Sequence, residues 1–210
     1  MGVMSTRLEQ IRLTAGGLVA VGILIVSVGA VTSRLGQLTV EDGDRAALKL
    51  AAVVAHSLDG SNRAQSVVLN ESEVNAYLMF HVVSELPVLI TEPQFNMLGD
   101  GRLLVEAVVG LEGLDLVGQS DSLNPLRYLR GSVKVAVRGS LNTDNGIGKL
   151  EVESVYVAGI PVPLNVLDDL VKRYSSTDRE PSGFDVSESF ALPYRIREVL
   201  IQVGEMVIVQ

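Results

Sequence analysis

In Leu69-Asn70-Glu71-Ser72-Glu73-Val74-Asn75-Ala76-Tyr77-Leu78 an apolar strand ends and a helix begins, and this junction decides the fold. Asn70 is a favoured N-cap residue, and Glu73 follows it by three positions, which is close to a capping box. From Ala76 to Val83 the helix is apolar nearly all round, with only His81 interrupting the run. Because a helix on the surface of a sheet keeps a polar stripe, the sequence predicts that this helix is enclosed.

Downstream of this helix the hydrophobic period changes from 3.6 residues to 2, which indicates strands. Apolar and polar residues alternate over Leu103–Leu111, Val133–Val137 and Leu150–Tyr156. Asp144-Asn145-Gly146 separates the last two segments and predicts a tight hairpin, because a type I′ turn needs positive φ at both central residues. Alternating strands joined by tight turns predict an antiparallel sheet with one covered face.

Three further segments complete the predicted order of elements. Residues 41–58 are expected to form a helix with an acidic first turn, which either stands as a stalk or packs on the fold. Its apolar residues recur at helical spacing and form one stripe: Leu48, Ala51, Ala52, Ala55 and Leu58. A later helix is expected over Asn165–Tyr174, and two strands are expected around Gly204 within Arg195–Val209.

The N-terminal region has the most extreme composition of the chain. Residues 13–33 contain no charged side chain, and as a helix they would extend about 30 Å, the thickness of the hydrocarbon core of a bilayer. Arg7 and Arg12 precede this stretch and acidic residues follow it, so the positive-inside rule predicts a cytoplasmic N-terminus and an extracytoplasmic domain, periplasmic or at the cell surface. The alternative is a cleaved signal peptide, with Ala30 as its last residue.

The sequence is accordingly divided into four parts. Residues 1–12 are the expected cytoplasmic N-terminus, and residues 13–33 are the expected transmembrane anchor or signal peptide. Residues 34–62 are expected to form a juxtamembrane helix and linker. Residues 63–210 are expected to form one extracytoplasmic α+β domain, a length that suits a single core.

Composition and motifs exclude several classes of function. The chain has no cysteine, so disulfides and Cys-based metal sites are excluded. Its net charge of -8 argues against binding nucleic acid, which needs clustered Lys and Arg. His81 on an apolar helix is more typical of a buried, hydrogen-bonded side chain than of a metal ligand or a base, and Ser120 lacks the second glycine of a nucleophile elbow. The sequence therefore predicts no enzyme, no metal site and no cofactor.

Three segments resemble small bacterial envelope proteins of the tubular lipid-binding superfamily. The first is Leu69–Leu78, which is similar to the helix-opening pattern of these proteins. The second is Gly159-Ile-Pro-Val-Pro-Leu-Asn-Val-Leu167, and the third is Ala191-Leu-Pro-Tyr-Arg-Ile-Arg-Glu-Val-Leu-Ile201. The resemblance covers roughly residues 66–210. It implies a curved antiparallel sheet that wraps a long helix and a hydrophobic ligand bound between them, without catalysis.

Residue patterns and resemblance together predict an α+β fold, in which an N-terminal transmembrane helix is followed by a curved antiparallel sheet packed around a long apolar helix. The expected function is non-catalytic binding of a lipid or acyl chain in the handling of envelope lipids. The residues expected to contact the ligand lie on the helix and on the inner face of the sheet: Val74, Tyr77, Leu78, Val82, Val105, Val109, Val133 and Val135.

The residues are also compatible with an ordinary closed core in place of a groove. In that case the domain is a structural or scaffolding module that contacts other envelope proteins. A filled interior with an exposed apolar patch favours the module, and an open apolar cavity favours ligand binding. The expected partners are thus a lipid or another hydrophobic ligand, the membrane through residues 13–33, and envelope proteins, with no nucleic acid.

Overall fold

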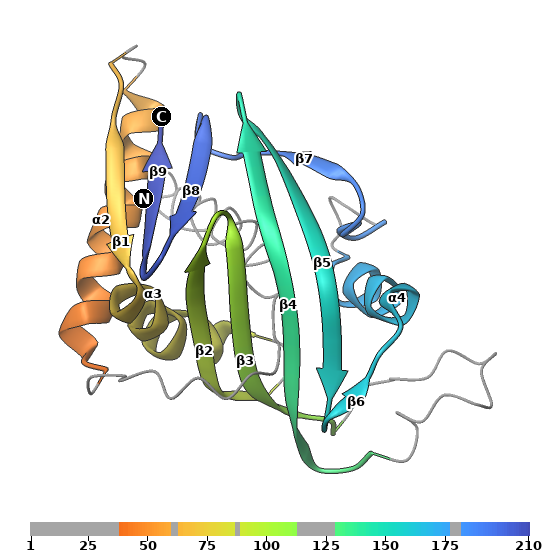
Figure 1. The fold of residues 1–210 in the computed structure, drawn as a ribbon. Coiled ribbons are helices and arrows are strands. Elements are labelled where there is room, and N and C mark those ends of the chain that lie inside the picture. The colour runs from red at the N-terminus through yellow and green to blue at the C-terminus, as the bar shows by residue number, and fades with distance from the viewer. Residues whose placement is uncertain (1–37, 60–62, 87–88, 113–128, 177–181) are drawn as a thin grey trace, which may run out of the picture.

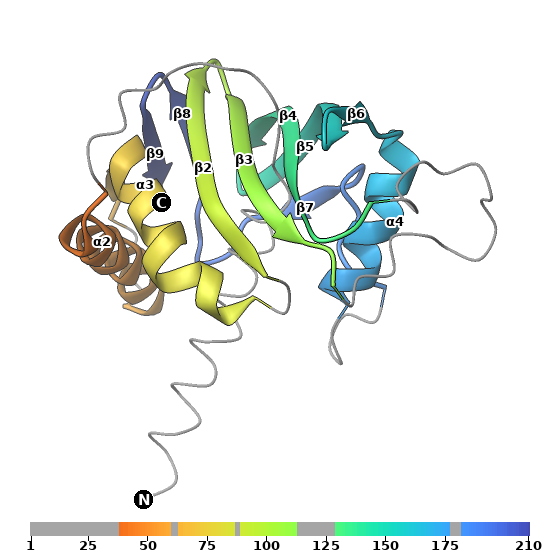
Figure 2. The same ribbon diagram turned by 90° about the horizontal axis from the view of Figure 1, so that it is seen from below.

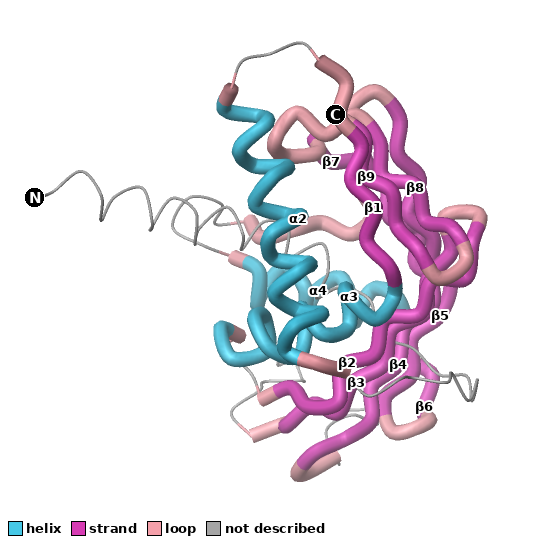
Figure 3. Tube along the Cα trace, turned by 90° about the vertical axis from the view of Figure 1, so that its left-hand side faces the viewer, coloured by secondary structure: helices cyan, strands magenta, loops and turns pink. Residues whose placement is uncertain are grey.

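The computed structural model describes residues 38–59, 63–86, 89–112, 129–176 and 182–210. Its strands form two antiparallel sheets on one side of the molecule, and its helices lie on the other side (Figures 1 and 3). The first sheet has the order β1 (Ser66–Asn70), β9 (Glu205–Val209), β8 (Glu198–Gln202). The second has the order β2 (Ile90–Gly99), β3 (Arg102–Gly110), β4 (Ser132–Asp144), β5 (Ile147–Val157), β6 (Ile160–Pro161), and β7 (Ser189–Ala191) also pairs with β5.

The helices cover the two ends of this strand layer. They are α2 (Val40–Leu58), α3 (Glu71–Tyr77) and α4 (Leu164–Ser175), and α3 continues as a π-helical turn (Leu78–Val82) and a 3₁₀ turn (Val83–Glu85). Figure 2 shows α2 and α3 together at one end and α4 at the other. The strand layer therefore lies between two groups of helices, α2 with α3 and α4 alone.

The junction between β1 and α3 has the predicted capping box. Asn70 Oδ1 accepts a hydrogen bond from the Glu73 amide at 2.8 Å, and Glu73 Oε2 accepts one from the Asn70 amide at 3.0 Å. Glu73 is almost fully buried and also accepts hydrogen bonds from Lys49 of α2. Burial alone raises the pKa of Glu73, but the hydrogen bonds from Lys49 and the Asn70 amide outweigh it and lower the pKa below its usual value.

Two side chains of α3 close the outer edge of β2. Asn75 Nδ2 donates to the Phe95 carbonyl at 2.9 Å, and Asn75 Oδ1 accepts from the Phe95 amide at 2.6 Å. Glu71 Oε2 accepts from the Met97 amide at 2.8 Å. These are the hydrogen bonds that a neighbouring strand would make, and an edge strand left open invites pairing with another chain. The sequence around Asn70 thus places α3 and seals the sheet at the same time.

Strand β8 links the two sheets. The Gly101 amide, in the β2–β3 turn, donates to the Ile201 carbonyl at 3.1 Å, and Leu98 forms an isolated antiparallel bridge with Val203. Further along the same edge of β8, Thr143 Oγ1 donates to the Val199 carbonyl at 3.0 Å and accepts from the Val199 amide at 2.8 Å. The two sheets are therefore held together by backbone groups as well as by side-chain packing.

The predicted hairpin at Asn145-Gly146 is confirmed. Asp144 pairs with Ile147 across the turn, and Asn145 and Gly146 have φ angles of 47° and 84°. Positive φ at both positions is what a type I′ turn requires. The helices expected near residues 41–58 and 165–174, and the two C-terminal strands on either side of Gly204, are also present.

α2 packs on the fold, but through a different face from the predicted stripe. Its buried residues are Gly43, Ala46 and Val53, of which Ala46 and Val53 share a core with Leu69 and Ile208. A side chain on Gly43 would lie 3.1 Å from the Ala76 carbonyl oxygen, so glycine permits the close approach of α2 to α3. The predicted stripe of Leu48, Ala51, Ala52, Ala55 and Leu58 is exposed, with 72% of Leu48 and 80% of Leu58 accessible to solvent.

The predicted fold class was wrong. The described residues form mostly antiparallel sheet, and the helix that follows Asn70 is regular only over Glu71–Tyr77. It is not enclosed either, because Phe80 is exposed and His81 is partly exposed. The physical reason is that the buried face of this short helix carries Glu73 and Asn75, which are satisfied by α2 and β2, so the apolar residues after them need not all face inward.

The predicted membrane topology is corrected as well. Among the helices that the structure describes, none has both the length and the apolar character that crossing a bilayer requires. The predicted single-pass membrane anchoring is therefore not supported by the described helices. The predicted anchor or signal peptide, residues 13–33, lies outside the described residues.

Candidate functional site

The predicted groove between helix and sheet is occupied by the protein's own side chains. Val74, Leu78 and Val105 pack in one hydrophobic core with Phe95 and Met97. Tyr77 packs with Val74 in the neighbouring core beneath α2. The remaining candidates are buried or partly buried: Val82, Val109, Val133 and Val135. Ligand contact by these eight residues stays a prediction, because apolar side chains on one face serve a closed core equally well.

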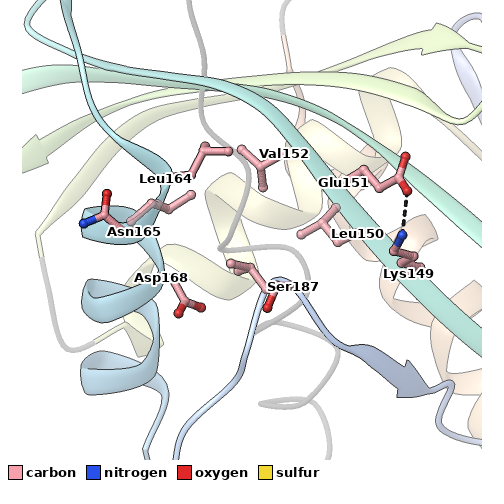
Figure 4. Close-up of a pocket in the computed structure, with 10 residues that line it drawn as sticks. Lys149, Leu150, Glu151, Val152, Leu164, Asn165, Asp168 and Ser187 are labelled. Atoms are coloured by element: carbon pink, nitrogen blue, oxygen red, sulfur yellow. Dashed lines mark hydrogen bonds and ion pairs between the residues drawn. The ribbon is translucent and has the colours of Figure 1, made fainter.

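A pocket of about 380 Å³ lies elsewhere, between β5 and α4 (Figure 4). Its apolar lining comes from both elements and from the segment after α4: Leu150, Val152, Leu164, Leu167 and Val186. Its polar lining consists of Lys149, Glu151, Asn165, Asp168 and Ser187. In Figure 4 the side chains of Leu150, Val152 and Leu164 point into the space between helix and strand, while Asp168 and Ser187 lie together at one end.

The local sequence explains why these side chains meet. Leu150 pairs with Leu141 of β4, which places its side chain on the face of the sheet that also carries the core residues Leu103 and Val105. On α4, Leu164, Leu167, Asp168 and Val171 are spaced at i, i+3, i+4 and i+7 and so share one face of the helix. This face turns toward β5, and it includes a carboxylate among apolar residues.

Charged residues gather at the end of the pocket where Asp168 lies. Lys172 Nζ is 2.7 Å from Asp168 Oδ2 and 2.6 Å from Asp185 Oδ2. The two carboxylates raise the pKa of Lys172, and Lys172 together with the Ser187 hydroxyl and amide lowers the pKa of Asp185. Ser187 Oγ donates to Asp185 Oδ1 at 2.5 Å. The cluster fastens α4 to the segment that carries Asp185 and Ser187.

One oxygen of this cluster has no partner. Asp168 Oδ2 accepts from Lys172, whereas Asp168 Oδ1 is buried and no side chain or backbone group of the described residues donates to it. Buried polar atoms in folded proteins are nearly always hydrogen-bonded, to protein or to water or ligand. An unsatisfied acceptor beside an apolar pocket therefore marks a position where a bound molecule can donate a hydrogen bond.

His81 lies far from this pocket along the chain, at the contact between α2 and the π-helical turn. Its Nε2 is 3.0 Å from Asp44 Oδ1, at an ion-pair distance but without hydrogen-bond geometry, and its ring stacks on Tyr77 with centroids 5.5 Å apart. The side chain is partly exposed, not buried as the sequence suggested. Within the ranges that the structure describes, no group of three or more His, Asp or Glu side chains is arranged to hold a metal ion.

No model of a known protein family matches the chain, and no curated protein is significantly similar to it. The resemblance to tubular lipid-binding proteins therefore rests on the three quoted segments alone and stays a prediction.

The pocket residues were missed at the level of sequence, although two signals for them exist. Leu150 and Val152 were in phase on a predicted strand, and Leu164 and Leu167 lie at the entry of a predicted helix. What periodicity does not reveal is that this strand and this helix face one another. The second signal is Asp168, an acidic residue on the apolar face of α4. A carboxylate in such a position is costly unless it has an ion-pair or hydrogen-bond partner.

Proposed function

We propose that the protein is a non-catalytic binding module that holds one apolar chain in the pocket between β5 and α4. The observation that carries this proposal is the lining of the pocket, in which the aliphatic side chains of Leu150, Val152 and Leu164 face the space between helix and strand and the polar side chains of Asp168 and Ser187 lie together at one end. Ligand sites in proteins are commonly apolar clefts of roughly 300–1,000 Å³ with a few polar groups that fix orientation. The volume of about 380 Å³ suits one small amphiphilic molecule.

The proposal predicts a dependence on chain length. Each methylene group removed from water contributes about 0.8 kcal/mol, which is roughly a fourfold gain in affinity. We expect the affinity of straight-chain 1-alkanols from hexanol upward to rise by about this factor per carbon and then to level off when the pocket is filled. Isothermal titration calorimetry of the full chain, below the solubility limit of each alcohol, measures this series.

A variant that fills the pocket locates the binding site. Leu167→Trp adds volume between α4 and β5, and we expect it to abolish the chain-length dependence. Leu48→Trp makes the same change on the exposed face of α2 and should leave binding unchanged. If no alkanol binds the unaltered protein, or if Leu167→Trp binds the series as the unaltered protein does, the proposal is wrong.

A second function is favoured by the exposed stripe on α2. An apolar helix face left in solvent is typical of a protein contact, and this one carries acidic residues at both ends, Glu41 and Asp44 before Leu48 and Asp59 after Leu58. The charge pattern complements a partner protein that presents an apolar groove with basic residues at its ends. The pocket and this stripe lie on different helices, so the two functions are compatible.

A basic amphipathic peptide with Leu and Lys at helical spacing serves as a defined probe for this surface. We expect the labelled peptide to bind the full chain in fluorescence anisotropy, more weakly as salt concentration rises. The double variant Leu48→Lys, Leu58→Lys should abolish binding. Binding that survives this double variant, or no binding of the peptide at all, contradicts a contact through the stripe.

A further inference from the structure

We infer that the pocket between β5 and α4 selects single-chain amphiphiles whose head group is an ammonium, which donates a hydrogen bond to Asp168 while the alkyl chain lies against Leu150, Val152, Leu164 and Leu167. This inference rests on the proposed function and adds the chemical class of the ligand. It is carried by the unsatisfied oxygen Asp168 Oδ1, by the charge at that end of the pocket, and by the position of Ser187.

One carboxylate oxygen of Asp168 accepts a hydrogen bond from Lys172, and the other has no donor among the described residues. Lys172 Nζ bonds to Asp168 Oδ2 at 2.7 Å, and the same ammonium bonds to Asp185 Oδ2 at 2.6 Å. Asp168 Oδ1 is left buried beside the aliphatic lining with no donor among the described residues. A ligand that brings an N–H donor to this oxygen removes the cost of an unsatisfied buried acceptor.

The charges around this end of the pocket favour a cation. Asp168 and Asp185 contribute two negative charges and Lys172 contributes one positive charge. The other charged residues that line the pocket, Lys149 and Glu151, pair with each other at 2.8 Å and cancel. The cluster therefore carries a net negative charge, which attracts an ammonium head group and repels a carboxylate or phosphate.

Ser187 supplies a second acceptor at the same end. Its hydroxyl hydrogen is donated to Asp185, and no hydrogen bond to Oγ is seen from the described residues, so its lone pairs can accept. Figure 4 shows the Ser187 and Asp168 side chains at the same end of the pocket, below the aliphatic residues. A primary ammonium carries three N–H donors, so one head group can bond to both acceptors and keep one donor for water.

Three probes of equal length separate this selectivity from general apolar binding. Decylammonium, 1-decanol and decanoate share a ten-carbon chain and differ only in the head group. Each is titrated into the full chain by calorimetry at pH 7, below its critical micelle concentration. A hydrogen bond to a charged group contributes about 1.5–3 kcal/mol, so we expect decylammonium to bind at least tenfold more tightly than decanol, and decanoate to bind most weakly.

A substitution at the carboxylate tests the assigned contact. Asp168→Asn keeps the size of the side chain and removes its charge, and we expect it to lower decylammonium affinity at least tenfold while decanol affinity changes by less than threefold. Asp169→Asn makes the same change of charge on the exposed neighbouring residue of α4 and serves as the matched control. It should change decylammonium affinity by less than twofold.

The outcomes distinguish binding of an apolar chain from selectivity for an ammonium head group. If none of the three probes binds, the proposed function fails and this inference fails with it. If decanoate binds as tightly as decylammonium, or if Asp168→Asn and Asp169→Asn weaken decylammonium equally, the pocket still holds an apolar chain but the ammonium selectivity is wrong. The comparison of probes on the unaltered protein decides the question even where Asp168→Asn fails to fold.

Discussion

At the scale of single residues, the side-chain amide of Asn75 makes the hydrogen bonds to β2 that a neighbouring strand would otherwise make. It donates to and accepts from the backbone of Phe95, which is the pattern of a hydrogen-bonded residue pair in an antiparallel ladder. The side chain is 1% exposed, so water does not compete for either bond. One residue on a short helix therefore fixes the distance between α3 and β2 and removes two unpaired groups from the sheet edge.

Replacing Asn75 tests this role directly. Asn75→Ala leaves the Phe95 amide and carbonyl without partners in a buried position, and each such group costs about 1–3 kcal/mol. We expect the free energy of unfolding in urea to fall by about 2–4 kcal/mol. Ser84→Ala, on an exposed position of the same helical region, should change it by less than about 0.5 kcal/mol. Similar values for the two variants would show that Asn75 does not carry the contact.

Glu73 makes stability depend on pH. Its pKa is lowered in the folded protein, so its contribution is present above the pKa of an unfolded glutamate, about 4.3, and is lost as pH falls through the lower folded value. We expect Glu73→Gln to destabilise the protein by about 1–3 kcal/mol at pH 7 and by progressively less below pH 4. Urea unfolding of both proteins between pH 3 and pH 7 measures the difference. A difference that is constant across this range contradicts the assignment.

Local spacing made part of this residue chemistry predictable. Asn70 and Glu73 form a capping box because both lie within one turn of helix, where residues that are close in sequence are also close in space. The bonds of Glu71 and Asn75 to β2 were not predictable, since their partners lie 26 and 20 residues away. For the same reason the sequence did not predict the ion pair between Lys172 and Asp185.

At the scale of elements, α4 is held to the molecule by an apolar face and by one charged bridge. Lys172 joins Asp168 on its own helix to Asp185 on the following segment. The pKa of Asp185 is lowered and that of Lys172 is raised, so the bridge contributes above the unfolded Asp value, about 3.9, and below the unfolded Lys value, about 10.4. Because the bridge is partly exposed, its effect on global stability is small.

The bridge should nevertheless govern local opening of the pocket. Lys172→Met keeps the aliphatic stem and removes the charge, and we expect amide hydrogen exchange in α4 and in residues 182–187 to become faster, while exchange in α2 is unchanged. Lys149→Met removes a lysine whose partner, Glu151, lies on the same strand, and it is the matched control. If α4 exchanges at the same rate in both variants, the bridge does not hold the helix.

Element positions were more predictable than element contacts. Period and turn chemistry identified α2, α4, the β4–β5 hairpin and the two C-terminal strands, because each of these depends on residues close in sequence. The buried face of α2 was predicted wrongly, since two sets of small and apolar residues recur at helical spacing. Gly43, Ala46 and Val53 form the buried set because small side chains allow α2 to approach α3. The apolar stripe through Leu48 and Leu58 lacks such a partner among the described residues.

At the scale of the whole molecule, the ends of the described chain meet in one core. Val53 of α2 packs with Leu69 of β1 and Ile208 of β9, and Gln210 Nε2 donates to the Val53 carbonyl at 3.0 Å. The first described helix is therefore packed against the last strand, and we expect it to unfold together with the sheets. Figure 1 shows the C-terminal part of α2 beside β1 and its N-terminal part beside α3.

A pair of substitutions on α2 tests this arrangement. Val53→Ala removes two methyl groups from a side chain that is 1% exposed, and we expect it to lower the free energy of unfolding by about 2 kcal/mol through lost burial and a residual cavity. Leu48→Ala removes more apolar surface from the same helix, but its side chain already faces solvent, so the change should stay within about 0.5 kcal/mol. A single unfolding transition for both variants, followed by far-UV circular dichroism in urea, is expected because α2 unfolds with the sheets. An early transition of α2 alone, or a larger loss for Leu48→Ala than for Val53→Ala, would place the helix outside the core and restore the face that its apolar stripe predicted.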